Sequence, residues 1–213
     1  MRGRPRACGS PASPGCADTS AREAERERGG HYDLLRGRIT FPIQDVRGRV
    51  IGFGGRALAP EQEPKYLNTL ESPVFRKREA LYGFPFALEP IRRRDRAVVV
   101  EGYFDLIALH RAGVEESVAT CGTALTEGHA RNLRRRTRNR VLLFDGDEAG
   151  QRAVLRALEV LLPQGLRVRA AALPGGEDPD DFLTRSGPAA LRDLIDSAPP
   201  ALDLAIQHAM DGG

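Results

Sequence analysis

From residue 97 onward the chain alternates short apolar runs with segments of helical spacing. Apolar or nearly apolar runs occupy residues 97–100, 117–121, 141–144 and 167–173. Segments whose apolar positions recur every three or four residues lie between them, at 104–113, 127–137 and 149–162. Runs without polar alternation are typical of strands that are covered on both faces. The pattern predicts an α/β fold with a doubly wound parallel sheet flanked by helices.

The segments on either side of this predicted sheet have different patterns. Two strand-like runs within residues 38–58 meet at Arg47 and Gly48, which predicts a hairpin in a small α+β subdomain. Helical spacing after Pro188 predicts the start of a helical subdomain. The first 30 residues are rich in Arg, Gly, Ala, Pro and Ser and lack apolar periodicity, which predicts disorder. We therefore expect four parts, at residues 1–30, 31–92, 93–185 and 186–213.

Acidic residues follow three of the apolar runs. Glu101 and Asp105 follow the first run, Asp145 and Asp147 the third, and the last run is followed by Glu177, Asp178, Asp180 and Asp181. The carboxyl ends of parallel strands line the ligand crevice of such a sheet, so we expect Glu101, Asp145 and Asp147 to converge there. Crowded carboxylates repel one another unless a cation joins them, and hard oxygen ligands suit Mg²⁺ or Mn²⁺.

Each acidic motif also has a purely structural interpretation. Asp147 is placed to cap the helix that follows it, and Asp105 or Glu148 would favour the positive end of a helix dipole. One motif alone does not separate the two interpretations. The succession of EG-x-x-D, DGD-x-AG and EDPDD along the chain favours a metal centre.

The acidic motifs and their surroundings resemble the Toprim domain and, more closely, the catalytic core of bacterial DNA primases of the DnaG type. The resemblance is nearly continuous from about residue 31 to the C-terminus. It is carried by RVIGFGGRAL at 49–58, PKYLNTLESPVFRKREALYGF at 64–84, VVVEGYFDLIAL at 98–109, SVATCGTALTEGHA at 117–130 and VLLFDGDEAGQRAV at 141–154. The acids alone also fit topoisomerases and nucleases, whereas the GFGGR and PKYLN segments are similar to primases specifically.

The resemblance implies DNA-templated synthesis of a short RNA primer by metal-dependent nucleotidyl transfer. It implies that Asp145 bridges two Mg²⁺ or Mn²⁺ ions and that Glu101 and Asp147 complete their first coordination shell. Asp105, Asp178 and Asp180 would hold waters or a further ion, and Glu101 acting as a general base is an alternative. The implied partners are a single-stranded DNA template, ribonucleoside triphosphates and, for the full-length family, a replicative helicase.

Four residues match primase positions that line a basic groove beside the acidic centre: Arg56, Lys65, Tyr66 and Lys77. Lysine and arginine there would neutralise phosphates, and the tyrosine would stack on a base. Solvation of the surface, and a core position for Tyr66, are the structural alternatives. The arginine-rich run at 131–140 has a helical spacing that keeps Ala130 and Leu133 inward, so we predict a solvated helix face there.

Composition agrees with a nucleic-acid enzyme of the cytoplasm but does not single one out. The 213-residue chain has 32 Lys and Arg, a formal net charge of only +3, and no run near the roughly 20 apolar residues that span a bilayer. We expect no membrane association. Cys8, Cys16 and Cys121 form no C-x-x-C pair, which favours a reducing compartment and no zinc site.

Two other functions stay open. A Toprim nuclease or topoisomerase-like enzyme would cut DNA with the same acids, although a type IA topoisomerase also needs a nucleophilic tyrosine in a separate domain, and Tyr103 lies inside the acidic motif. An inactive remnant would bind nucleic acid without catalysis. We find no segment that resembles the zinc-binding or helicase-binding domain of primases, and nothing primase-like in the first 30 residues. We therefore expect a fragment that primes weakly alone.

Overall fold

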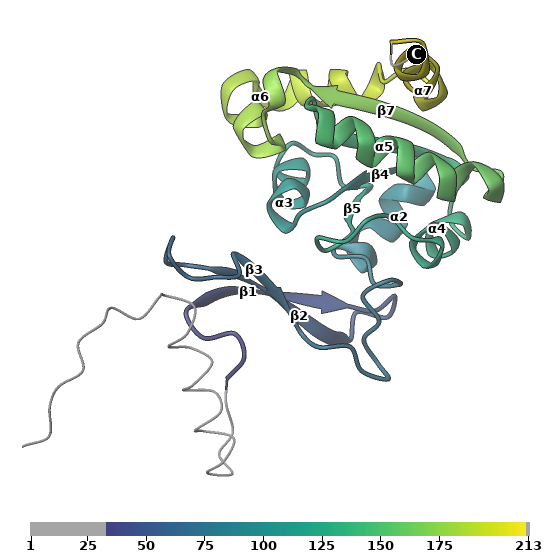
Figure 1. Cartoon of the computed structure of the whole chain (residues 1–213). Coiled ribbons are helices and arrows are strands. Elements are labelled where there is room, and N and C mark those ends of the chain that lie inside the picture. Colours follow the sequence, from purple (N-terminus) through teal and green to yellow (C-terminus); the bar gives the residue numbers. More distant parts are fainter. Residues whose placement is uncertain (1–32, 212–213) are drawn as a thin grey trace, which may run out of the picture. The chain divides into compact units, whose positions relative to one another are not determined.

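The structure is a computed structural model that describes residues 33–211 and contains two sheets (Figure 1). The first has the order β1-β2-β3, with strands at Arg38–Gln44, Val50–Ala57 and Tyr66–Asn68. The second has the order β5-β4-β6-β7, with β4 at Ala97–Val100, β5 at Ser117–Ala119, β6 at Asn139–Asp145 and β7 at Arg167–Leu173. Every neighbouring pair of strands in the second sheet is parallel, which confirms the predicted fold class.

Helices follow or separate the strands of the parallel sheet. The α-helices are α2 (Phe84–Arg94), α3 (Tyr103–Arg111), α4 (Glu127–Arg134), α5 (Glu148–Leu161), α6 (Pro179–Asp196) and α7 (Ala201–Asp211). Two short 3₁₀ helices, η1 (Leu162–Gln164) and η2 (Pro174–Gly176), flank β7. Among residues 33–211, none of the helices is long and apolar enough to cross a membrane.

The described residues divide into two compact units. Residues 33–40 and 55–67 form the smaller unit, and residues 41–54 and 68–211 form the larger one. The larger unit contains the whole parallel sheet with its helices. The predicted leader at residues 1–30 lies outside the described residues, as do Cys8 and Cys16.

The apolar runs of the parallel sheet are unbroken because helices cover both faces. Successive residues of β4 enter opposite clusters: Val99 packs in the cluster that contains residues of α2, α4, α5 and α7, whereas Val98 and Val100 pack in the cluster that contains residues of α3 and α6. The side chains of a strand alternate between faces, so every position of such a strand must be apolar.

The predicted hairpin is confirmed at the turn between β1 and β2. The Gly48 amide donates to the Asp45 carbonyl, and Gly48 takes a φ of 77°, which glycine adopts without strain. Gly54 on β2 marks a close approach: a Cβ there would lie 2.2 Å from the hydroxyl oxygen of Tyr103, whose ring stacks on Phe41 at 4.7 Å between centroids. The GFGG segment is thus a packing feature and does not form a phosphate loop.

The helices differ from the expected pattern at two places. Helix α2 lies in the segment for which only a small α+β subdomain was predicted, and its residues contain Pro85 in the first turn and Pro90 in the interior. The range of α6 consists of two helical stretches, one that begins at Pro179 and one after Gly187, where the backbone leaves helical geometry at φ 80° and ψ 170°, so the second stretch is the helix predicted after Pro188. The later part of α6 packs on the sheet through Leu191 and Ile195, both fully buried.

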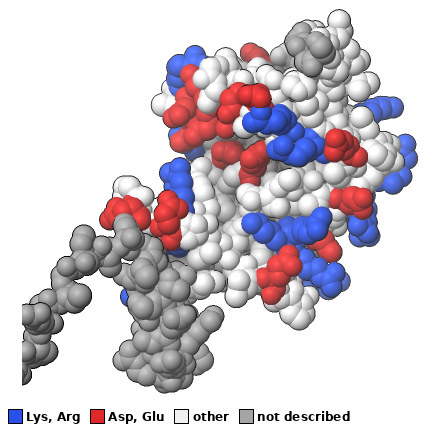
Figure 2. Space-filling view, in the orientation of Figure 1, with Lys and Arg blue, Asp and Glu red and all other residues white. Residues whose placement is uncertain are grey.

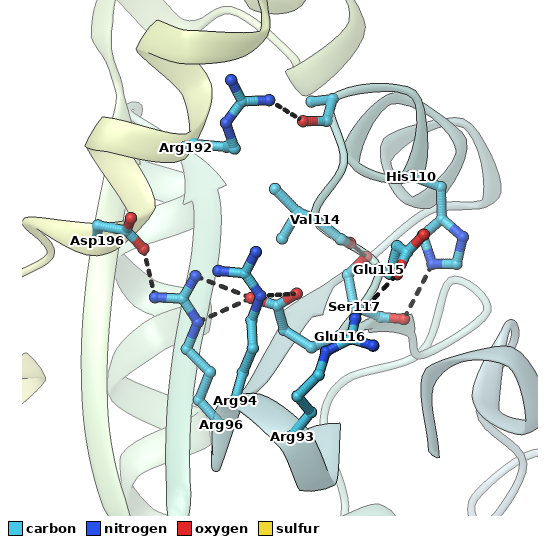
Figure 3. A network of polar contacts seen from close by, with 11 residues as sticks. Arg93, Arg94, Arg96, His110, Val114, Glu115, Glu116, Ser117, Arg192 and Asp196 are labelled. Carbon is cyan, nitrogen blue, oxygen red and sulfur yellow. Dashed lines mark hydrogen bonds and ion pairs between the residues drawn. The ribbon is translucent and has the colours of Figure 1, made fainter. Parts of the chain in front are cut away.

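A buried ionic network lies at the edge where the strands of the parallel sheet begin (Figure 3). Glu116, just before β5, is only 1% exposed and contacts Arg94 and Arg96. Arg96 also pairs with Asp196 at the end of α6. These pairs tie the ends of α2 and α6 to the start of the sheet, and each buried charge has an opposite charge beside it.

Candidate functional site

Four of the six predicted metal ligands line one cavity at the carboxyl edge of the parallel sheet. The cavity has a volume of about 230 Å³, and its acidic lining residues are Glu101, Asp105, Asp145 and Asp147. Glu101 directly follows β4 and Asp145 ends β6, so neighbouring parallel strands deliver them to the same edge. In Figure 2 acidic side chains gather over α3, α6 and the adjoining loops. Glu101, Asp145 and Asp147 thus line the same cavity, as the sequence predicted.

Asp105 and Asp147 have local structural partners as well. The Gly102 amide donates to Oδ2 of Asp105 at 2.8 Å, and the Gly150 amide donates to Oδ1 of Asp147 at 2.7 Å. Asp147 is the N-cap of α5, as the structural interpretation predicted. Within the part of the chain that the structure describes, Oδ2 of Asp147 accepts no hydrogen bond, so this carboxylate can cap the helix and still face a ligand.

Negative charge accumulates around Asp145. Its pKa is raised to about 6, first by partial burial and then by the charges of Asp105, Glu101, Asp147 and Asp178. Burial also raises the pKa of Asp105, and the hydrogen bond from the Gly102 amide opposes this. A bound cation would remove the repulsion that both shifts report.

Asp178 and Asp180 lie at the start of α6, outside the lining of the cavity. Asp178 is the N-cap and accepts from the amides of Asp180 and Asp181. Asp180 forms an ion pair with Arg111 at 2.7 Å. Asp178 is close enough to act electrostatically on Asp145 and Asp105, whereas the role of Asp180 as a ligand stays a prediction.

The donor set fits a hard divalent cation, although the carboxylates are not closed around one point. Among residues 33–211, no three Asp, Glu, His or Cys side chains are arranged to hold an ion as they stand. Mg²⁺ usually keeps several waters and needs only one or two protein carboxylates together with substrate phosphates. A wall of carboxylate oxygens around an open cavity meets that requirement.

One residue of the cavity was missed from the sequence. Arg156 of α5 lines the cavity together with Ala149 and Ala153. The signal was present, since positions 149, 153 and 156 follow the helical spacing that puts residues on one face. An exposed arginine beside the acids offers a positive charge for a substrate phosphate.

The predicted basic residues fall in both compact units. Arg56, Lys65 and Tyr66 belong to the smaller unit, where the guanidinium of Arg56 lies 5.7 Å from the centre of the Tyr66 ring. Tyr66 is 42% exposed, which excludes the core position considered for it. Lys77 belongs to the larger unit and lies near Cys121: burial raises the pKa of that thiol to about 11, and the charge of Lys77 opposes the shift. Their role in binding nucleic acid stays a prediction.

Two family models match separate stretches of the chain. A Toprim-like model matches residues 98–183, the stretch that carries all the acidic motifs. A model of the N-terminal domain of the DNA primase catalytic core matches residues 16–88. The second match begins at residue 16, so the expectation that nothing in the first 30 residues is primase-like is wrong for residues 16–30.

Relatives and solved structures agree with these matches. The DNA primase of Myxococcus xanthus is 45% identical over 172 residues, which cover 80% of this chain and 28% of the relative. The RNA polymerase domain of Mycobacterium tuberculosis primase DnaG matches with a TM-score of 0.80 and 34% identity, over 90% of this chain and 70% of that structure. A DnaG primase catalytic domain bound to single-stranded DNA matches with a TM-score of 0.78 and 38% identity, over 92% and 66%.

The chain spans 27% to 37% of the length of curated relatives such as those of Myxococcus xanthus, Halalkalibacterium halodurans and Aquifex aeolicus. Within that span, the parallel sheet, its acidic edge and the matched segments all correspond to one part of these enzymes, the metal-dependent catalytic core. The chain therefore belongs to the family of bacterial DNA primases of the DnaG type and contains the Toprim region of their catalytic core.

Proposed function

We propose that the acidic cavity of this chain is the nucleotidyl-transfer centre of a DNA primase, which joins ribonucleotides into a short RNA primer on a single-stranded DNA template. The observation that carries the proposal is the convergence of four carboxylates on one cavity, with the pKa of Asp145 raised to about 6 by burial and neighbouring acids. Carboxylates held close enough to raise one another's pKa are typical of a site that binds metal.

In the proposed reaction the acids hold two Mg²⁺ or Mn²⁺ ions and the substrate. Asp145, at the end of β6, would be a metal ligand, and Glu101 and Asp147 would be the others. The ions, when bound, lower the pKa of the attacking 3′-hydroxyl and offset charge on the pyrophosphate leaving group. Asp105 and Asp178 would hold waters of a bound ion, and Asp180 would do so once released from its ion pair with Arg111. Arg156 is placed to bind a phosphate of the ribonucleoside triphosphate.

Four residues are proposed to hold the nucleic acid or nucleotide: Arg56, Lys65, Tyr66 and Lys77. Lys65 and Tyr66 are both exposed, and Tyr66 offers an aromatic face for a base. Phosphate contacts carry charge but little sequence information. Lys65→Ala and Lys77→Ala should therefore each weaken binding of single-stranded DNA to a similar extent for different sequences, as measured by fluorescence anisotropy. A loss that depends on base sequence would contradict a phosphate role.

A primer-synthesis assay tests the proposed function. The chain is incubated with single-stranded template, labelled ribonucleotides and Mn²⁺, and Asp145→Asn is run beside it. We expect RNA products that depend on the template and are absent with Asp145→Asn, even where the yield is low. Cleaved DNA in place of RNA would assign the centre to a nuclease, and products that persist with Asp145→Asn would remove it from the chemistry. In the whole family member, a replicative helicase is the expected partner.

A further inference from the structure

A hollow lined by arginines lies at the amino edge of the parallel sheet, opposite the acidic cavity. It has a volume of about 320 Å³, and every residue that lines it is charged or polar: Asp95, Arg134, Arg136, Thr137, Arg138, Asn139 and Arg167. Arg134 ends α4, Asn139 begins β6 and Arg167 begins β7. Register pairs Asn139 with Arg167, so residues distant in sequence meet at one place. In Figure 2 basic side chains lie along the right-hand edge of the view, away from the acidic group.

The arginines of this hollow are exposed and lack acidic partners. Within residues 33–211, none of Arg134, Arg136, Arg138 and Arg167 forms an ion pair or donates a side-chain hydrogen bond, in contrast to Arg94 and Arg96 nearby. The hollow is lined by four arginines and one aspartate, so its formal charge is +3. This equals the formal net charge of the whole chain. Such a local excess attracts anions even on a protein whose total charge is small.

The single acid of the hollow is already engaged by neutral donors. The carboxylate of Asp95 accepts from the Thr137 hydroxyl at 2.8 Å and from the side-chain amide of Asn139 at 2.9 Å. These bonds hold the loop between α4 and β6 and leave the arginines without a salt bridge. Asp95 thus holds the loop in place and does not pair with the arginines of the hollow.

A buried arginine fixes the backbone beneath the hollow. Arg140 is fully buried, and its guanidinium donates to the carbonyls of Asn139 and Thr137, each at 2.9 Å. Burial lowers its pKa to about 10, which leaves it protonated at neutral pH. The loop that carries Arg136 and Arg138 is therefore anchored, and a further positive charge lies below it.

The lining indicates which kind of anion would bind. It offers neither an aromatic ring nor an apolar surface for a base, and it is an open hollow. A pocket for a free nucleotide is enclosed and mostly apolar, whereas arginines on an open surface suit the phosphates of an extended polymer. The hollow is separated from the acids by the length of β6, from Asn139 to Asp145, or about 20 Å at the usual rise of a strand.

We propose that this arginine hollow is a second contact for the nucleic-acid backbone, which binds phosphates without regard to sequence about 20 Å from the nucleotidyl-transfer centre. The contact goes beyond the proposed catalysis and needs neither metal nor nucleotide. It would hold a strand on the larger unit independently of Lys65 and Tyr66, which belong to the smaller one.

Binding of a labelled oligothymidine to the whole chain, measured by fluorescence anisotropy in EDTA over a range of salt, tests the proposal. Arg136→Ala with Arg138→Ala should weaken binding on the order of tenfold at low salt and reduce the magnitude of the salt slope by about 1.4, or about 0.7 per lost phosphate contact on a single strand. Arg136→Lys with Arg138→Lys keeps the charge and should restore most of the binding. Circular dichroism and thermal melting check that the variants fold.

The matched control removes two arginines from the same edge of the sheet that already have acidic partners. Arg92→Ala with Arg93→Ala changes the net charge equally, but Arg92 pairs with Glu89 and Arg93 with Glu115, so the salt slope should change little. An equal loss in this control, or an unchanged affinity in the hollow variant, would overturn the proposal. Inorganic tripolyphosphate and poly-glutamate serve as competitors. Displacement of DNA by either at lower charge concentration than unlabelled oligothymidine would assign the hollow to free polyphosphate or to an acidic protein instead.

Discussion

The charged side chains at the two edges of the parallel sheet have opposite surroundings. At the amino edge, Glu116 is buried between Arg94 and Arg96, and the buried Arg140 donates to backbone carbonyls. At the carboxyl edge, Asp145 is surrounded by acids that raise its pKa. A fold gains nothing in stability from carboxylates that repel one another, so the carboxyl edge is arranged for a ligand, whereas the buried charges of the amino edge serve the structure.

Loss of the Glu116 charge should destabilise the amino edge strongly. Glu116→Gln keeps the shape of the side chain but leaves Arg96, which is only 16% exposed, without its buried counter-charge. We expect the free energy of unfolding to fall by about 3 kcal/mol in chemical denaturation. Glu115→Gln is the matched control, because Glu115 pairs with Arg93 on the surface, and it should cost less than about 1 kcal/mol. Equal losses in the two variants would show that the buried network does not hold the edge together.

At the carboxyl edge, removal of a carboxylate charge should raise the free energy of unfolding. The pKa of Asp145 is about 6 in the folded chain and ordinary when unfolded, so the folded state binds more protons between about pH 4 and 6. Stability of the metal-free chain therefore falls as pH rises through that window. Asp145→Asn should remove the part of this fall that comes from Asp145 and raise the free energy of unfolding at pH 7, by no more than about 1 kcal/mol because the side chain is partly exposed. Denaturation of both chains at pH 5 and pH 7 measures the difference.

Asp203→Asn is the control for that experiment. Asp203 lies exposed in the first turn of α7, remote in sequence from the acidic motifs. We expect its pH dependence to follow that of the unaltered chain. If Asp145→Asn lowers stability at pH 7, the carboxylate makes a favourable contact and is not repelled by its neighbours.

The smallest expected effect tests whether the two edges act independently. About 20 Å of β6 separates the arginine hollow from Asp145, and distant sites add in free energy within about 0.5 kcal/mol. Arg136→Ala with Arg138→Ala should leave the Mn²⁺ affinity unchanged in calorimetric titration. A weaker or tighter affinity beyond that margin would show that the edges are coupled.

The sequence predicts this sheet well because its strands are covered on both faces. The apolar runs at Ala97–Val100 and Val141–Phe144 follow from two-sided burial, and the abrupt change to Glu101 and Asp145 marks the carboxyl edge. Tertiary packing decides the features that were missed. Helix α2 starts with Pro85 in its first turn, where proline is tolerated, and forms despite the interior Pro90, with Phe84 and Ile91 buried in the core cluster of the sheet.

The arginine-rich run shows where local periodicity fails. Ala130 and Leu133 are fully buried, as the helical spacing predicted, but α4 ends at Arg134. Arg136 and Arg138 lie in the loop that follows, and Arg140 lies in β6 with no exposed surface, so the prediction of a solvated helix face is wrong beyond Arg134. The hollow depends on Arg167 from β7, and only the register of the sheet places that residue beside Asn139.

The most direct test of the central claim is a calorimetric titration of Mn²⁺ into the chain and into Asp145→Asn and Glu101→Gln, with Asp203→Asn as control. These variants preserve shape and remove one carboxylate charge each from the acidic cavity. We expect the chain and the control to bind Mn²⁺ with equal affinity and both cavity variants to lose binding while remaining folded. Unchanged Mn²⁺ affinity in Asp145→Asn and Glu101→Gln would contradict the assignment of this cavity as the metal centre.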